Sequence, residues 1–155
     1  MGSIIFFNKN DQLIELFEIR KLLETQSVKW AVSNIQHKHI EELNSFIDKD
    51  LDYIKNKEKY IDISLADQKF HLLISKLSGN SVLYRIMYNL IDLMKEVRME
   101  TLQIPGRLEK SVEEHREILK ALSNKDAIQS ERKMLEHLNS VENALIKKNV
   151  RKKRS

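Results

Sequence analysis

Apolar residues recur every three or four positions along most of this sequence, which is the spacing of side chains on one face of an α-helix. This period predicts six helices, over about residues 11–34, 37–56, 63–77, 81–103, 108–123 and 125–149. Ser78-Gly79-Asn80 and the pair Pro105-Gly106 mark two of the breaks, because glycine ends helices and proline cannot continue them. Connections this short make neighbouring helices antiparallel. We therefore expect an all-α antiparallel bundle of about six helices.

The composition of the 155 residues agrees with a single helical domain. Three glycines and one proline are too few for the many turns that a chain of short strands needs. A content of 41% hydrophobic residues is sufficient for one core. The lack of cysteine excludes disulfides and thiolate metal sites and fits a reducing cytoplasm, where we expect the protein to work. No apolar run reaches the roughly 20 residues that cross a bilayer, so we expect no membrane partner.

The chain divides into three expected parts. Residues 1–10 form an N-terminal extension or an expression remnant, residues 11–149 form the helical domain, and residues 150–155 form a basic tail. The formal net charge is +4, and six of the last nine residues are basic. Such a run is typical of a solvated, partly frayed tail, and contact with DNA phosphates is the alternative.

Several polar residues fall on the apolar faces of the predicted helices, where Leu or Ile is usual. Asp67 and His71 are four residues apart and therefore lie one turn apart on the same face, although an ordinary hydrogen-bonded pair has the same spacing. His115 and His137 each lie in the middle of the apolar stripe of a later helix. Each of them alone is compatible with a core histidine that makes one hydrogen bond.

Together, these four residues predict a site for a divalent metal. Burying them without a common partner would cost several kcal/mol in lost hydration and unmet hydrogen bonds, and a shared cation removes most of that cost. Imidazole and carboxylate ligands suit zinc, nickel, manganese, iron and cobalt, and the ligand type does not choose among them. Zinc is the metal that we expect first. The candidate ligands, called the ligand set below, are Asp67, His71, His115 and His137.

Arg20 faces the same interior, and Arg98 is a second, weaker candidate. Arg20 lies on the apolar side of the first helix, four residues before Glu24, a spacing that also suits a simple ion pair. Arg98 lies at the edge of the apolar face of residues 81–103. A guanidinium near a metal would bind one carboxylate of a small organic acid whose other end meets the metal. Arg20 and Arg98 are therefore candidate effector-binding residues.

A metal held by three histidines and an aspartate is also compatible with a metalloenzyme that activates water. The sequence has no His-Glu-x-x-His and no Glu-x-x-His pair, and Glu114 is expected to point to another side of its helix than His115. We therefore expect no enzyme activity and no catalytic residues. A helical interaction module with coincidental histidines is the third interpretation.

Several short segments follow one another in a distinctive order along nearly the whole chain. They are Leu16-Phe17-Glu18-Ile19-Arg20-Lys21-Leu22-Leu23-Glu24, Asp67-x-x-Phe70-His71, Ser78-Gly79-Asn80, Glu114-His115-x-x-Ile118-Leu119-x-Ala121-Leu122, Asp126 and Met134-x-x-His137-Leu138. In this order they resemble the FCD effector-binding domain of GntR-family transcription regulators. The resemblance implies a helical bundle that binds a metal through the ligand set, with a small carboxylate completing the metal's coordination. Six helices are more similar to the VanR-type subgroup than to the FadR-type.

The sequence departs from that family at its start. Family members carry a winged helix-turn-helix before the FCD domain, and residues 1–10 cannot hold a three-helix DNA-binding unit. We therefore expect either a sensor domain excised from a regulator or a natural stand-alone sensor. It would reach operator DNA only through the missing N-terminal domain.

The expected mechanism is a ligand-controlled switch. An acid bound by the metal and Arg20 would shift the population between two dispositions of the attached DNA-binding domains. Because operators have two-fold symmetry, we also expect a homodimer. The residues do not choose among lactate, gluconate, citrate, an acyl compound or an amino acid as the effector.

Overall fold

A computed structural model describes residues 9–56 and 60–154 of the chain. In this part of the chain the secondary structure is helical, which confirms the predicted all-α class. The helices are α1 (Lys9–Ala31), α2 (His37–Asn56), α3 (Tyr60–Leu77), α4 (Ser81–Leu93), α5 (Lys95–Leu102), α6 (Arg107–Ser123) and α7 (Ala127–Arg154).

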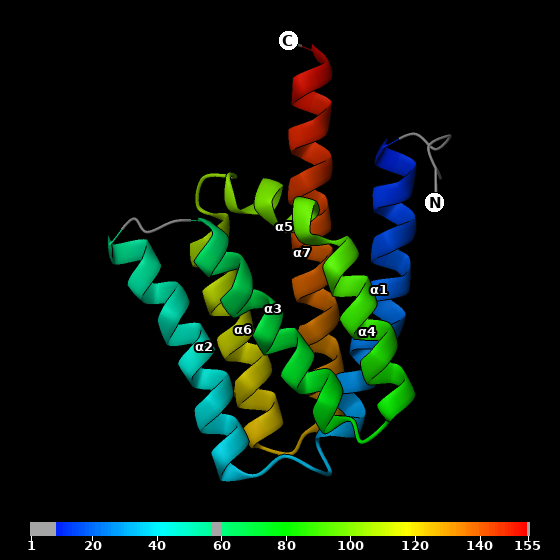
Figure 1. Ribbon diagram of the computed structural model, residues 1–155, viewed down its shortest axis with the longest axis vertical. Coiled ribbons are helices and arrows are strands. Elements are labelled where there is room, and N and C mark those ends of the chain that lie inside the picture. The colour runs from blue at the N-terminus through cyan, green and yellow to red at the C-terminus, as the bar shows by residue number, and fades with distance from the viewer. Residues whose placement is uncertain (1–8, 57–59, 155) are drawn as a thin grey trace.

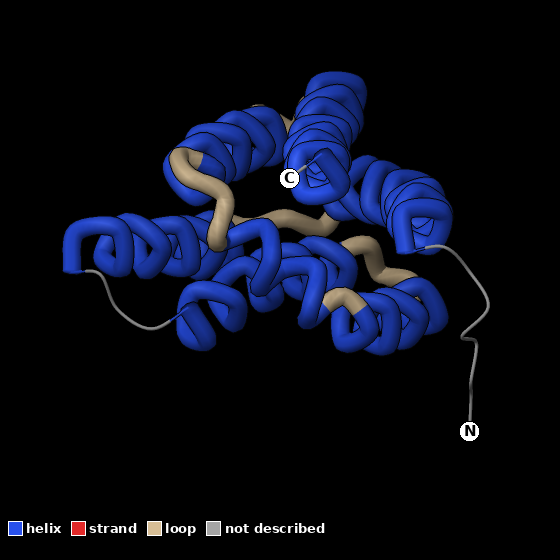
Figure 2. The backbone as a smooth tube through the Cα atoms, turned by 90° about the horizontal axis from the view of Figure 1, so that it is seen from above, coloured by secondary structure: helices blue, strands red, loops and turns tan. Residues whose placement is uncertain are grey.

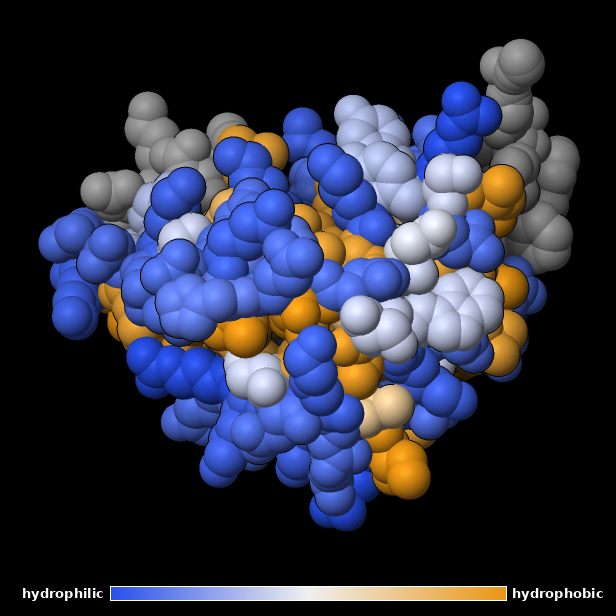
Figure 3. All heavy atoms as spheres, turned by 90° about the horizontal axis from the view of Figure 1, so that it is seen from below, coloured by the Kyte–Doolittle hydropathy of each residue, from blue (hydrophilic) through white to orange (hydrophobic). Residues whose placement is uncertain are grey.

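The six longer helices form two layers of three. α6, α7 and α1 lie side by side in one layer, and α2, α3 and α4 form the other (Figures 1 and 2). These helices alternate in direction, as predicted, while the short α5 lies across one end of the bundle (Figure 1). At the opposite end, hydrophilic side chains cover most of the surface and apolar ones show between them (Figure 3).

The predicted helix over residues 81–103 is divided at Met94, so the described residues form seven helices where six were expected. Arg98 donates from Nη1 to the carbonyl of Ile91 at 2.7 Å, and this carbonyl is the one that Lys95 would use in an unbroken helix. The guanidinium therefore supplies a hydrogen-bond donor to the last turn of α4, so the chain can change direction before α5 without leaving that carbonyl unpaired. The number of helices no longer favours the VanR-type subgroup.

The turn between α3 and α4 has the predicted form. Gly79 has a φ of +76°, the left-handed conformation that ends a helix, and Asn80 Oδ1 accepts from the Leu83 amide at 2.9 Å. Asn34 Nδ2 closes the same corner by donating to the Leu77 carbonyl at 2.8 Å. This corner fixes the direction in which α3 enters the core.

The core lies between the layers and uses most of the predicted apolar stripes. Phe17, Phe70 and Leu138 are fully buried or nearly so. Ile86 is an exception, because the apolar period of residues 81–103 includes it but its side chain is 47% exposed. The buried stripe of α4 runs along the adjacent side of that helix, through Leu83, Met87, Leu90 and Ile91.

The last helix is longer than its pattern predicted. α7 continues through Arg154, so residues 150–154 of the expected tail are helical, with exposed side chains. The start of α1 and the end of α7 lie at the same end of the bundle (Figure 1). Among the described helices, none is long and apolar enough to cross a membrane.

Candidate metal centre

Three helices bring the predicted ligand set to one place in the core. Asp67 and His71 lie on α3, His115 on α6 and His137 on α7. The three imidazoles are at most 2% exposed and offer ligand atoms within 4.8 Å of one another. The Asp67 side chain is more open, with 21% exposure. Residues that are distant in the sequence thus meet around one point.

The distances within the ligand set suit a single small cation. The Nε2 atoms of His115 and His137 are 3.2 Å apart, and Asp67 Oδ1 is 3.6 Å from Nε2 of both His71 and His115. Ligands bound at about 2.0–2.1 Å in a tetrahedral zinc site lie about 3.3–3.4 Å from one another. Nε2 of His71 is buried without a hydrogen-bond partner among the described residues, which leaves it available to a cation.

Two glutamates contact the opposite edges of the histidine rings. Nδ1 of His71 is hydrogen-bonded to Glu24 Oε1, and Nδ1 of His137 lies 2.9 Å from Glu114 Oε1. A carboxylate at Nδ1 holds the proton on that nitrogen and directs Nε2 to the ligand side, as second partners of metal-bound histidines do. Both Nε2 atoms therefore face the rest of the ligand set.

His115 is oriented by packing instead. The Phe70 ring stacks on its imidazole with 4.3 Å between ring centroids. Nδ1 of His115 is buried without a partner in the described part of the chain, so no carboxylate holds this ring at Nδ1 as Glu24 and Glu114 hold the other two. A cation at Nε2 would offset part of the cost of burying it.

Among the three histidines of the site, His71 is the one that carries a positive charge. Burial opposes its charged form, but the Glu24 and Asp67 carboxylates outweigh burial and raise the pKa of His71 to about 9. Burial would raise the pKa of Glu24, yet Arg20 and His71 lower it to about 2. Against the same effect of burial, His71 and His115 hold the pKa of Asp67 well below its usual range.

The other two histidines are neutral near pH 7. Burial holds the pKa of His115 well below its usual value, and the neighbouring His137 and His71 rings shift it in the same direction. Burial also lowers the pKa of His137, although its hydrogen bond to Glu114 opposes the shift. Without a metal, the proton on His71 supplies the positive charge that a cation would bring.

The two candidate effector residues are both buried and both line one cavity beside the ligand set. Arg20 forms an ion pair with Glu24, the pairing that its spacing also suggested. Arg98 contacts Ser64 Oγ at 3.3 Å in addition to the Ile91 carbonyl. The same cavity is lined by Asp67 and His137, so the arginines and the ligand set share a space.

This cavity is small. It holds about 30 Å³, which suits one or two water molecules, since a water needs at least roughly 10–15 Å³ measured in this way. An organic acid of several carbon atoms does not fit into it as it stands. Helices around the cavity would have to move before such a molecule could bind.

Asp50 on α2 was missed by the sequence-based prediction. It is 2% exposed, it lines the same cavity, and its Oδ1 has no hydrogen-bond partner among the described residues. Burial, together with the charge of Asp67, raises the pKa of Asp50 to about 8. Its position three residues after Ile47, on the apolar stripe of α2, was the signal that could have identified it.

Glu114 contacts the ligand set in a way that the sequence did not predict. It does lie on another side of α6 than His115, but that side faces α7, where it reaches His137. Arg107, one of the buried residues of α6, pairs with the same carboxylate. The spacing of Arg107, Ser111 and Glu114 places them on one face, which could have indicated this polar contact to α7.

Comparison with known proteins gives a consistent result. The family model described as the FCD domain matches residues 15–140. The Uxu operon regulator of Haemophilus influenzae is 26% identical over 134 residues, which cover 82% of this chain and 48% of that protein. The uncharacterized HTH-type transcriptional regulator YcbG of Bacillus subtilis is 27% identical over 146 residues, covering 94% of this chain and 59% of that protein. The chain thus spans about half the length of these relatives.

Solved structures have the same fold. The chain resembles McbR/YncC of E. coli with a TM-score of 0.80 and 24% identity, over 91% of this chain and 70% of that one. It resembles a GntR protein of Streptococcus agalactiae with a TM-score of 0.73 and 24% identity, over 89% of this chain and 62% of that one. Both curated relatives are named as regulators rather than as enzymes.

Proposed function

The chain belongs to the FCD domain family, and from this premise we propose that it is the effector-sensing domain of a GntR-family transcription regulator and that its sensing depends on a divalent metal. The ligand set would hold the metal, with zinc first and nickel, manganese, iron and cobalt as alternatives. The observation that carries this proposal is the convergence of three imidazoles and one carboxylate, with two of the rings held by glutamates.

The proposed effector is a small carboxylate. Arg20 and Arg98 line the cavity beside the ligand set, and guanidinium groups bind carboxylates through paired hydrogen bonds. One end of the acid would complete the coordination of the metal, and the other would meet an arginine. Asp50 lies in the same cavity and would contact a polar group of the acid.

The size of the cavity supports a switch. Because about 30 Å³ does not admit an organic acid, binding would require α5 and Arg98 to shift away from the end of α4. A ligand that fits only the open arrangement shifts the population towards it. This rearrangement would be the signal that reaches an attached domain.

The DNA-binding step and the dimer are proposals for the longer protein. One relative is named as an HTH-type regulator, and this chain spans about half of its length. We propose that operator DNA is bound by an attached N-terminal domain. A homodimer would form through apolar side chains that neighbouring helices leave exposed, Leu22 of α1 with Val82 and Leu93 of α4.

The test combines metal analysis with an acid screen. Purified protein should contain close to one divalent metal ion per chain, and organic acids should raise its melting temperature only when the metal is present. His37, an exposed histidine outside the site, offers the matched control, because H37L should bind metal as the parent chain does. If the chain neither retains nor binds any divalent metal, the proposal is wrong.

A further inference from the structure

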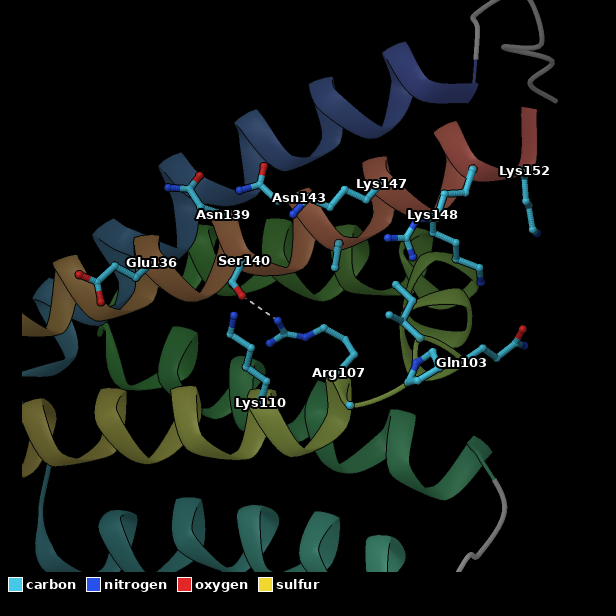
Figure 4. Close-up of a pocket in the computed structure, with 15 residues that line it drawn as sticks. Gln103, Arg107, Lys110, Glu136, Asn139, Ser140, Asn143, Lys147, Lys148 and Lys152 are labelled. Carbon is cyan, nitrogen blue, oxygen red and sulfur yellow. Dashed lines mark hydrogen bonds between the residues drawn. The ribbon is translucent and has the colours of Figure 1, made fainter. Parts of the chain in front are cut away.

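A second hollow lies away from the candidate metal centre. It is a groove of about 1010 Å³ between the C-terminal half of α7 and the turn from α5 to α6 (Figure 4). Figure 4 shows Arg107 and Lys110 rising from α6 towards Ser140 on α7. The groove shares no lining residue with the small cavity beside the ligand set.

The groove is strongly basic. Six of its lining residues are cationic, namely Arg107, Lys110, Lys147, Lys148, Arg151 and Lys152. Its one carboxylate, Glu136, already pairs with Arg132 at 2.9 Å and Lys133 at 3.0 Å, which do not line the groove. In the described part of the chain, Lys110, Lys147 and Arg151 have no carboxylate partner. At least three of the six cations, Lys110, Lys147 and Arg151, therefore bring positive charge that no carboxylate of the described residues neutralises.

The other lining groups suit a small molecule. Asn139 and Asn143 present amides from the same face of α7 as Lys147, and Ile104 and Ala144 add apolar surface. The volume lies at the upper end of the range of roughly 300–1,000 Å³ that small-molecule sites occupy. Exposed lysines on one solvated face would not by themselves require a ligand, but these cations surround a concavity that also offers hydrogen-bonding groups.

We propose that this groove binds a phosphorylated small molecule. Lysine ammonium groups from both α6 and α7 would neutralise the phosphate, since lysine binds phosphate as a point charge. The amides of α7 would accept and donate hydrogen bonds to hydroxyl groups of the same molecule. This site is spatially separate from the metal centre and from the cavity of the carboxylate effector proposed above.

A chain of contacts joins the groove to the ligand set. Arg107 donates from Nη1 to Ser140 Oγ, at the wall of the groove, at 2.7 Å. Its Nη2 pairs with Glu114, and Glu114 accepts the hydrogen bond of His137. A phosphate near Arg107 would compete with Glu114 for the guanidinium and thereby change the environment of the His137 ring.

The direct test is calorimetric titration of the metal-free chain with inorganic pyrophosphate. Working without metal prevents the probe from acting as a chelator and separates this site from the metal centre. We expect saturable binding of one pyrophosphate per chain. The double variant K110Q/K147Q should weaken it by at least about tenfold, because two charge-assisted contacts are lost.

The matched control is K76Q/K120Q, which removes the same charge from exposed lysines outside the groove and should leave the affinity unchanged. Equal weakening in both double variants would overturn the proposal, as would the absence of saturable binding. Displacement of pyrophosphate by short duplex DNA at lower concentration would also overturn it, in favour of a nucleic-acid surface.

The contact chain is tested by NMR of the histidine rings in the same titration. Pyrophosphate should shift the ring signals of His137 and leave those of the exposed His37 in place. At a pyrophosphate concentration near the parent dissociation constant, the shift should be several times smaller in K110Q/K147Q than in the parent chain. Unchanged His137 signals at saturation would overturn the connection between the groove and the ligand set.

Discussion

The Nε2 atoms of His115 and His137 face each other at 3.2 Å inside the core, from two different helices. When both rings are neutral and Nδ1 of His137 donates to Glu114, Nε2 of His137 can only accept, so the hydrogen bond needs a proton on Nε2 of His115. Nδ1 of His115 is then an acceptor without a partner among the described residues. A cation between them, with His71 and Asp67 as further ligands, satisfies both nitrogens at once. The consequences of this arrangement can be measured.

Replacing His115 and His137 with leucine should abolish metal binding. A metal present at 100 times its dissociation constant stabilises a protein by about 2.7 kcal/mol, which corresponds to roughly 5–10 °C in melting temperature for a chain of this size. EDTA should therefore lower the melting temperature of the parent chain and leave that of H115L/H137L unchanged. A double variant that still responds to EDTA would place the metal elsewhere.

Metal affinity should rise with pH. His71 has a pKa of about 9 in the metal-free protein, and its proton must leave before the metal binds. The affinity should increase by about tenfold per pH unit between about pH 6.5 and 9 and then level off. Competition with a chelator of known pH dependence measures this slope, and a flat profile would contradict the assignment.

Protonation of His71 opposes metal binding, but it stabilises the folded state of the metal-free protein. The pKa of His71 is raised above its ordinary value of 6.5, so the metal-free folded state binds its proton more tightly than the unfolded state does. The stabilisation is complete below pH 6.5 and is lost as pH rises through about 9. The difference in unfolding free energy between the metal-free parent chain and H71Q should shrink over that range, and denaturant titration measures it.

Glu114→Gln should weaken metal binding without unfolding the protein. The carboxylate orients the His137 ring, and loss of such a partner typically reduces metal affinity by about 10–100-fold. Glu113→Gln is the matched control, because the neighbouring residue is exposed. Equal metal affinities for E114Q and E113Q in calorimetry would show that Glu114 does not support the site.

Asp50→Asn should stabilise the metal-free protein at high pH. Burial raises the pKa of Asp50 to about 8, far above its ordinary value, so this carboxyl group destabilises the fold increasingly as pH rises from about 4 to 8. We expect D50N to exceed the parent chain in stability by about 1–3 kcal/mol at pH 8 and by little at pH 4. Denaturant titration at both pH values in EDTA tests this, and a constant difference would contradict it.

Arg98→Gln should reduce binding of the effector and leave metal binding intact. Arg98 lines the cavity but does not contact the ligand set, and loss of its charge-assisted hydrogen bonds should weaken acid binding by about tenfold or more. Thermal shift with the best acid of the screen and a separate metal titration distinguish the two effects. Parallel loss of metal would show that Arg98 acts through the fold instead.

The sequence was sufficient for the fold class, most helix boundaries and the convergence of the ligand set, because all of these depend on helical period. Asp67 and His71 are adjacent on any helix, and the apolar neighbours of His115 and His137 place those rings inwards. The break at Met94 was not visible, since the apolar period continues through it and the carbonyl of Ile91 is satisfied by a side chain seven residues away.

The partners of the ligand set were harder to predict for a related reason. Glu24 and Glu114 contact histidines on other helices, and such contacts depend on how the helices pack rather than on spacing within one helix. Asp50 was hidden in an otherwise apolar stripe. The size of the cavity also follows from packing alone, so a sequence cannot show that it is closed to an organic acid.

The helix that holds Glu24 can also transmit a movement from the core to the edge of the domain. From Glu24, which contacts His71, α1 runs without interruption back to Lys9 at the end of the bundle where α7 also ends (Figure 1). Fifteen residues at about 1.5 Å each make a rigid arm of about 22 Å. A tilt of about 5° at the histidine would therefore move the far end by about 2 Å, so an adjustment of one hydrogen bond in the core becomes a displacement at the edge of the domain.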